Sequence, residues 1–374
     1  MSCEVYINGI GVFLPNAPVG NEAMEDVLGR IGTRPSRARA RILRSNGITS
    51  RYYAIDPATG RATHTNAQLT ATAVRNLAGD GFSAENVDVL ACGTSLPDQL
   101  MPNHGVMVQG ELGWPACEVA ATAGICLSGI MALKYVWLSI KAGESGQGVA
   151  TGSENASAVL RGDLYTGATG QGDVDFSLDF LRWMLSDGAG AVWLSNTKNQ
   201  ETISLRIDWI VQKSYAGELA TCMYAGAEKR EDGALAGWRS FAPEQWAAES
   251  IFAVKQDLKL LNKEVIAYTV TRPLRQLLTS GRLEPQAIDW YLPHYSSAFF
   301  RDRVSAGMKE AGCDIPQEKW FTNLADKGNT GSASIYIMLE ELFHSGRLCR
   351  GERLLCYIPE SGRFSTAFMQ LTVV

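Results

Sequence analysis

Residues 120–129 read Ala-Ala-Thr-Ala-Gly-Ile-Cys-Leu-Ser-Gly and place one cysteine, Cys126, in a run of small side chains. The following residues repeat apolar side chains at helical spacing, which predicts a helix over 126–140 that begins at Cys126. Unpaired N–H groups and the positive end of the helix dipole favour a thiolate in the first turn, so Cys126 is a candidate nucleophile. By position alone, a buried cysteine that packs as a small hydrophobe is the commoner case.

Outward from this helix, strand-like and helical stretches alternate along the whole chain. The stretches with strand character are 5–14, 87–92, 188–194, 203–211, 288–292, 353–358 and 364–373. The stretches with helical spacing are 65–77, 126–140, 243–278, 298–310 and 332–343. Pro273 should kink or break the third of these helices near Arg272. The alternation predicts a layered α/β architecture with largely buried sheets.

The two halves of the chain show a similar order of elements. Strands 5–14 and 203–211 each open a half, and the helices over 126–140 and 332–343 each follow a loop of small residues. This order predicts a duplicated α/β unit with halves 1–196 and 197–374. Two further stretches, 153–187 and 213–241, are rich in Gly and charged residues and are expected to be long loops or insertions.

The composition narrows the class of protein. The chain has 374 residues, of which 46% are hydrophobic and 20% charged, which is typical of a globular protein. A net charge of -5 argues against a general nucleic-acid binder, and no apolar run is long enough to span a membrane. Eight cysteines without a CxxC pair indicate reduced thiols. Together with the lack of a signal-peptide pattern, they predict a cytoplasmic protein.

Two further positions are candidates for chemistry. His294 follows the predicted strand 288–292, and ligands of α/β proteins bind at strand ends, although a structural histidine there is equally plausible. Asn329 lies in a loop of small residues, where it would either cap a helix or donate a hydrogen bond to an oxyanion. The four histidines show no metal-ligand spacing, and no phosphate loop or dinucleotide fingerprint is present, so no metal or nucleotide cofactor is predicted.

Cys126, His294 and Asn329, in this order and with their flanking residues, resemble the Cys-His-Asn set of the thiolase superfamily. The chain is most similar to the β-ketoacyl-acyl carrier protein synthase III family. The further matching stretches are 48–51 (Ile-Thr-Ser-Arg), 185–191 (Leu-Ser-Asp-Gly-Ala-Gly-Ala), 288–294 and 328–334. The resemblance covers nearly the whole chain. It implies a thiolase-like, five-layered αβαβα fold made of two duplicated halves, and a homodimer.

The resemblance also implies an acyltransferase that performs a decarboxylative Claisen condensation. Cys126 would take an acyl group from an acyl-CoA or an acyl carrier protein, so CoA and phosphopantetheine thioesters are substrates and no resident cofactor is implied. The second substrate would be a malonyl- or β-ketoacyl-carrier-protein thioester. His294 and Asn329 would stabilise the enolate formed when a malonyl-type group loses carbon dioxide, and the product would be a β-ketoacyl thioester.

Several minor roles follow from the same matching. The backbone N–H groups of Cys126 and Gly362 would form the oxyanion hole for acylation. Met101 would reach into the partner's acyl pocket, and Lys263 would dock the acidic carrier protein, although a surface lysine is usually just solvated.

The chain departs from the family pattern at three places. Residues 295–297 read Tyr-Ser-Ser where the family has Gln-Ala-Asn, and 361–363 read Ser-Gly-Arg where it has glycines. Residues 43–46 read Leu-Arg-Ser-Asn and lack the family's tryptophan. If the family's tryptophan stacks on the CoA adenine, its absence here favours an acyl donor bound to a carrier protein over an acyl-CoA. These departures suggest a specialised biosynthetic enzyme.

Alternatives within the same chemistry remain. One is a condensing and cyclising ketosynthase of the dialkylresorcinol or cyclohexanedione type, and another is a non-decarboxylative head-to-head condensation of two acyl chains. A catalytically silent partner subunit is disfavoured because Cys126, His294 and Asn329 are all retained. A degradative thiolase is disfavoured because the cysteine nearest to Gly362 is Cys356.

Overall fold

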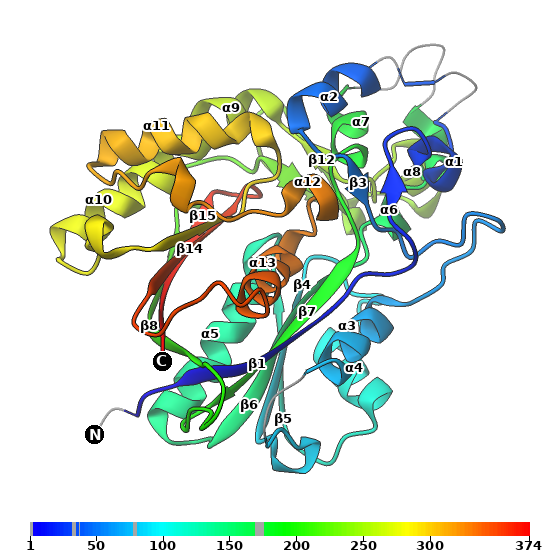
Figure 1. Ribbon diagram of the computed structural model, residues 1–374. Coiled ribbons are helices and arrows are strands. Elements are labelled where there is room, and N and C mark those ends of the chain that lie inside the picture. The colour runs from blue at the N-terminus through cyan, green and yellow to red at the C-terminus, as the bar shows by residue number, and fades with distance from the viewer. Residues whose placement is uncertain (1–2, 32–34, 37, 78–80, 169–175) are drawn as a thin grey trace.

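The computed structural model describes residues 3–31, 35–36, 38–77, 81–168 and 176–374, and its centre is a nine-stranded mixed sheet (Figure 1). The strands are β1 (Tyr6–Phe13), β4 (Val89–Thr94), β5 (Glu118–Ala123), β6 (Gln147–Glu154), β7 (Gly188–Ser195), β8 (Leu205–Ser214), β13 (Trp290–Pro293), β14 (Arg353–Glu360) and β15 (Ser365–Val373). Their order is β13-β14-β15-β8-β1-β7-β6-β4-β5. All seven predicted strands are confirmed to within a few residues at each end.

The two halves of the chain use their strands in the same way. In the first half, β4 pairs with β6 in parallel, and β6 with β7 and β7 with β1 in antiparallel fashion. In the second half, β13 pairs with β14 in parallel, and β14 with β15 and β15 with β8 in antiparallel fashion. Strands β1 and β8 then join the two halves through only two residue pairs. The repeated order agrees with a duplicated unit, while the division at 196 and 197 stays a prediction.

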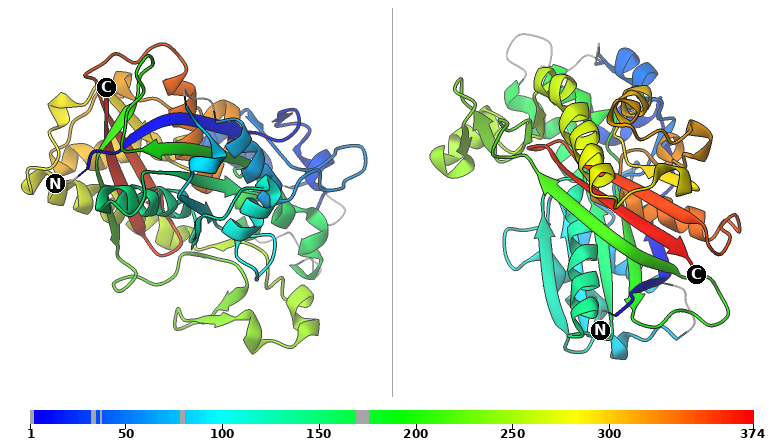
Figure 2. Two further views of the ribbon diagram at one scale, coloured as in Figure 1. Left: turned by 90° about the horizontal axis from the view of Figure 1, so that it is seen from below. Right: turned by 90° about the vertical axis from the view of Figure 1, so that its left-hand side faces the viewer.

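Helices separate and cover the two half-sheets, which gives five layers. Helices α5 (Leu127–Ala142) and α13 (Ser334–Phe343) lie in the middle, and both pack against strands of each half. Helices α3 (Asn66–Arg75) and α4 (His104–Leu112) cover the outer face of the first half. A long helical segment and α11 (Arg301–Ala311) cover the second (Figures 1 and 2). This is the predicted αβαβα fold.

The long helical segment differs from its prediction. The stretch 243–278 is not one helix: α8 (Pro243–Ala248) ends, the chain forms the short strand β12 (Lys255–Gln256), and α9 (Leu258–Ile266) begins only afterwards. The chain then runs through a π-helical turn, η4 (Ala267–Thr271), into α10 (Arg272–Thr279). Pro273 does not break the segment, because it lies in the first turn of α10, where its missing N–H is tolerated.

The two stretches expected as loops contain regular structure. The stretch 213–241 belongs to a longer segment, residues 213–257, which is called the insertion below. It includes β9 (Met223–Tyr224), β10 (Ala227–Lys229), β11 (Leu235–Gly237) and α8, and β9 pairs with β12. It stands out from the body of the molecule in Figure 2. The other stretch includes α6 (Ser157–Leu160), η2 (Gly162–Ala168) and α7 (Phe176–Arg182), and its residues 169–175 lie outside the described part.

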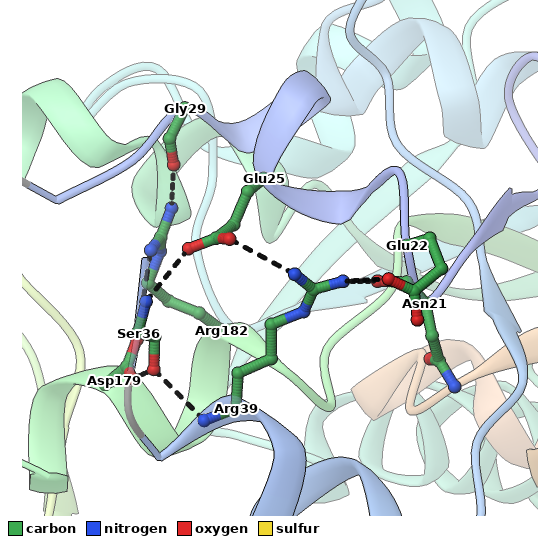
Figure 3. A network of polar contacts seen from close by, with 8 residues as sticks. All are labelled: Asn21, Glu22, Glu25, Gly29, Ser36, Arg39, Asp179 and Arg182. Carbon is green, nitrogen blue, oxygen red and sulfur yellow. Dashed lines mark hydrogen bonds and ion pairs between the residues drawn. The ribbon is translucent and has the colours of Figure 1, made fainter. Parts of the chain in front are cut away.

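Buried polar contacts fix α7 (Figure 3). The Arg182 guanidinium donates to the carbonyl oxygens of Leu160 at 2.8 Å and Gly29 at 2.6 Å, and lies 3.8 Å from Asp179 Oδ1. Ser36 donates to the other oxygen of Asp179, and so ties the segment before α2 (Arg39–Asn46) to α7. Because these groups are buried and paired, α7 has a defined position beneath the cavity described below.

Two observations bear on the predicted compartment. All eight cysteines are free thiols. Among the described residues, no helix combines the length and the apolar character that a membrane span requires.

Candidate active site

Cys126 lies at the junction between strand β5 and helix α5. It occupies the N-cap position of α5, directly after the loop at Gly124, whose φ of 136° is accessible mainly to glycine. The helix begins one residue later than predicted and ends at Gly143 in the left-handed conformation. The sequence therefore placed the cysteine correctly at a helix N-terminus.

The ionisation state of Cys126 differs from the expectation. Burial, reinforced by the nearby charges of Glu154 and Glu360, raises the pKa of the Cys126 thiol. The helix N-terminus would lower that pKa, but the cost of desolvating a thiolate is larger here. These effects favour the thiol, whereas the helix N-terminus alone favours the thiolate.

His294 follows β13 at the end of the strand. Its backbone N–H donates to the Tyr357 carbonyl oxygen at 2.8 Å, which continues the pairing of β13 with β14. The side chain is buried, and burial lowers the pKa of His294 to about 4. The imidazole is therefore neutral at physiological pH and keeps one N–H donor.

Asn329 lies on a loop held close to the Cys126 helix. Its backbone N–H donates to the Met184 carbonyl oxygen at 3.0 Å, and its side-chain oxygen accepts from the Gly331 N–H at 3.0 Å. The loop approaches because positions 129 and 152 are glycine: a Cβ at either would lie 2.4 Å from the Ser332 carbonyl oxygen. With its oxygen engaged, Asn329 presents its amide NH2 as the donor group.

Two cavities meet at Cys126. One of about 230 Å³ is lined by Cys126, Asn329 and Glu154 together with mostly apolar side chains. The other, of about 40 Å³, runs from Cys126 past His294 to side chains of α9 and α11. Cys126, Ser296 and Ser361 line both cavities, so the structure brings together all three members of the predicted Cys-His-Asn set.

Glu154 is a cavity residue that the sequence analysis missed. Its Oε1 accepts hydrogen bonds from the N–H and the hydroxyl of Ser95 and from the Ser332 N–H, at 2.6 to 3.2 Å. Burial raises the pKa of Glu154 to about 7 although these donors lower it. The residue ends β6, a strand of small and polar side chains that was not recognised, so no periodicity pointed to it.

A substitution at Glu154 should alter how stability depends on pH. The folded state keeps a proton that the unfolded state loses between pH 4.5 and about 7, so wild-type stability falls as pH rises through that window. Glu154→Gln does not titrate and keeps an oxygen for Ser95 and Ser332. We expect it to be on the order of 3 kcal/mol more stable than wild type at about pH 8, with no gain near pH 4.

Urea unfolding of both proteins at the two pH values measures this difference. The exposed Glu310 provides the matched control, since Glu310→Gln changes a surface carboxyl and leaves the cavity untouched. A Glu154→Gln difference that does not change with pH would contradict the raised pKa.

The N–H of Gly362, the predicted oxyanion donor, has another acceptor in this structure. It donates to the carboxylate of Glu360, which also accepts from the Arg363 N–H at 3.3 Å and the Ser365 N–H at 3.2 Å. The Gly362 carbonyl oxygen in turn accepts from the insertion. Ser361, one residue earlier, lines both cavities at Cys126 instead. Residues 361–363 read Ser-Gly-Arg where the family has glycines, so the sequence alone could not show which residue of this turn lies toward Cys126.

Met101 and Lys263 lie outside the cavities. Met101 is 82% exposed and does not line the cavity of its own chain. Lys263 is on α9 with 78% of its side chain exposed, and it pairs with Glu264 at 2.9 Å. Leu261 and Val265, on the same helix, line the narrow cavity. Among the described residues, no cluster of three or more His, Cys, Asp or Glu side chains could hold a metal ion.

Comparisons with known proteins agree with this geometry. Residues 278–358 match the family model of the 3-oxoacyl-[acyl-carrier-protein (ACP)] synthase III C terminal. The β-ketoacyl-[acyl-carrier-protein] synthase III of Xanthomonas oryzae pv. oryzae is 24% identical over 359 residues, 95% of each chain.

Two solved structures show the same fold. A tetronic acid condensing enzyme superposes with a TM-score of 0.77 at 19% identity, over 98% of this chain and 99% of that one. A variant of Xanthomonas campestris OleA with bound lauric acid and lauroyl-CoA gives 0.73 at 19% identity over both complete chains. Because a curated synthase III aligns with this chain almost from end to end and residues 278–358 match the C-terminal family model, the chain is similar to β-ketoacyl-acyl carrier protein synthase III along nearly its whole length, which indicates a synthase III-like condensing enzyme.

Proposed function

We propose that Cys126 accepts an acyl group and that the acyl-enzyme condenses with a malonyl-carrier-protein thioester, which loses carbon dioxide, or with a β-ketoacyl-carrier-protein thioester, which loses an α-proton instead. The observation that carries this proposal is the meeting of two cavities at Cys126. The wider, mostly apolar cavity suits an acyl chain. The narrow one, which passes His294 and reaches α9, suits a thioester-bearing arm.

The proposed acylation transfers one proton from the Cys126 thiol to the leaving thiol. The sulfur of Cys126 attacks the thioester carbonyl, and the thiol of CoA or the carrier leaves with the proton that Cys126 gives up. The backbone N–H of Cys126 and that of Ser361 are the proposed donors to the transient oxyanion, because the Gly362 N–H is engaged by Glu360.

The proposed condensation relies on two neutral donors. Loss of carbon dioxide from the second thioester leaves an enolate, and the N–H of His294 and the NH2 of Asn329 donate to its oxygen. The low pKa of His294 supports this role, because a neutral imidazole donates a hydrogen bond without protonating the carbanion. The carbanion attacks the acyl carbonyl and releases the Cys126 sulfur.

A homodimer is part of the proposal. Strand β5 forms one edge of the sheet, and all six of its residues are partly or fully exposed. The exposed large apolar side chains near this edge are Leu100, Met101, Val106, Tyr135 and Leu138. An unpaired edge strand flanked by apolar side chains is typical of an interface. In such a dimer Met101 would approach the partner's cavity.

The donor is proposed to be a carrier-bound or CoA-bound acyl group. Exposed Lys263 shares α9 with three side chains that line the narrow cavity, so an acidic carrier protein that docks there would present its arm to Cys126. The bound lauroyl-CoA of the OleA structure supports a CoA donor equally.

Glu154 favours a second candidate, a condensation without loss of carbon dioxide. A carboxyl with a pKa of about 7 in the cavity of Cys126 is suited to accept the α-proton of a second acyl thioester. In a decarboxylative reaction no such base is required, since the carbanion arises from the malonyl group itself.

Two mass measurements test the proposal. The protein is incubated with a panel of acyl-CoAs and acyl carrier proteins, and we expect a mass gain that peptide mapping places on Cys126. Adding malonyl carrier protein should then discharge the acyl-enzyme and release carbon dioxide. Discharge by a second acyl thioester without carbon dioxide would select the Glu154 alternative. No mass gain with any donor would contradict the proposed acylation.

A further inference from the structure

We propose that the β9/β12 ribbon, the pair of short strands Met223–Tyr224 and Lys255–Gln256, sets the longest acyl chain that Cys126 accepts. The inference rests on the proposed acylation of Cys126. It assigns the chain-length limit to this chain's own insertion, in addition to any residue that a partner contributes.

The ribbon and its flanking residues form one wall of the wide cavity. The side chains that they contribute are Met223, Tyr224, Ala225, Val254 and Gln256. The cavity is also lined by Leu181 and Leu185, which lie in and just after α7. Helix α7 packs against β12, and Leu181 and Val254 belong to the same buried apolar cluster. The insertion and α7 therefore form a packed wall on this side of the cavity, which an acyl chain would meet as it lengthens.

The ribbon is fixed to the turn beside Cys126. The N–H groups of Cys222 and Met223 donate to the Gly362 carbonyl oxygen at 2.7 and 3.2 Å. The Gln256 amide donates to the Ser361 hydroxyl at 3.1 Å, and Ser361 lines both cavities. These bonds join the wall of the cavity to the residue next to the reacting sulfur.

Ion pairs and backbone bonds stiffen the ribbon itself. Lys229 pairs with Asp257 at 2.8 Å, and Lys255 pairs with Glu228. The Asp257 N–H donates to the Cys222 carbonyl oxygen at 2.7 Å. With three of these four charged side chains at least partly buried, the wall has a defined distance from Cys126. A fixed wall gives a sharp cut-off in chain length, because each methylene beyond it must displace packed side chains.

The test uses two substitutions of opposite effect. Ala225 is partly buried and lines the cavity, so Ala225→Leu fills it with an isobutyl group in place of a methyl. For the longest acyl chain that the wild type accepts, we expect the rate of Cys126 acylation to fall by about 10-fold or more, and the rate of acetyl transfer to fall much less. Val254→Ala removes two methyl groups from the same wall and should extend acceptance to a longer chain.

Acylation of the full-length protein is followed by intact mass spectrometry over a series of straight-chain acyl-CoAs and acyl carrier proteins. Leu235→Ala, in β11 of the same insertion but outside the cavity, is the matched control. Circular dichroism checks that each variant folds. If Ala225→Leu does not fold, the chain-length profile of Val254→Ala alone tests the inference.

The outcomes separate this inference from the proposed function. An unchanged chain-length profile in the folded variants, with a shift only in Met101→Ala, would overturn the inference and assign the limit to the partner. A wild-type protein that no donor acylates would instead contradict the proposed function.

Discussion

Cys126→Ala should abolish acylation by every donor and, with it, the condensation. The side chain makes no capping hydrogen bond to α5, so its loss should leave the fold intact. No other cysteine lines either cavity, which leaves no thiol to replace it. His294 and Asn329, the proposed donors to the enolate, remain, so cleavage of carbon dioxide from malonyl carrier protein should persist in the variant. Intact mass spectrometry and a carbon dioxide assay measure the two activities separately.

The control for this prediction is another cysteine on the same chain. Cys349 is exposed and lies far from the cavities, and Cys349→Ala should acylate as the wild type does. A mass gain that survives in Cys126→Ala would show that another nucleophile takes the acyl group. Equal losses in both variants would indicate damage to the fold.

Strands were predictable where side chains alternate and not where they are uniformly small. Strands such as β8 and β15 carry large apolar residues that mark their buried face. Strands β5 and β6 read Glu-Val-Ala-Ala-Thr-Ala and Gln-Gly-Val-Ala-Thr-Gly-Ser-Glu, and they showed no clear pattern. Their small residues have a structural reason, because Gly152 of β6 must let the Asn329 loop approach. The small residues that allow the Asn329 loop to approach are therefore the same ones that leave β6 without a recognisable strand pattern.

The strands of the insertion could not be predicted from the hydrophobic pattern either. Its strands are two or three residues long, too short for a period of two to appear. The sequence predicted a long loop or insertion here, but only the tertiary contacts of β9 and β12 show that the region reaches the cavity.

Charge around the nucleophile depends on residues that are distant in sequence. The position of Cys126 at a helix N-terminus was readable from its neighbours, and it favours a thiolate. The carboxyls that raise its pKa come from the ends of β6 and β14, which lie 28 and 234 positions away along the chain. The same carboxyl of Glu360 engages the Gly362 N–H, which no local pattern could indicate.

Asn329→Asp should uncouple the two half-reactions in the opposite sense to Cys126→Ala. The aspartate keeps the oxygen that accepts from the Gly331 N–H at 3.0 Å, so the loop should hold its shape, but the NH2 donor is lost. Removing one donor from an oxyanion site typically lowers the rate by about 10²- to 10³-fold. We therefore expect condensation to fall by that factor, while Cys126 still takes up an acyl group.

A second variant separates the lost donor from the added negative charge, which would face Glu154 across the cavity. Asn329→Ala removes the donor without adding charge, and it should show a similar loss of condensation. Asn323→Ala is the matched control, because the Asn323 amide donates to Glu341 at 2.9 Å outside both cavities. Single-turnover acylation by mass spectrometry, followed by product formation with malonyl carrier protein, gives both rates. If both Asn329 variants condense at the wild-type rate, the enolate oxygen does not depend on this amide, and His294 with a backbone donor must stabilise it instead.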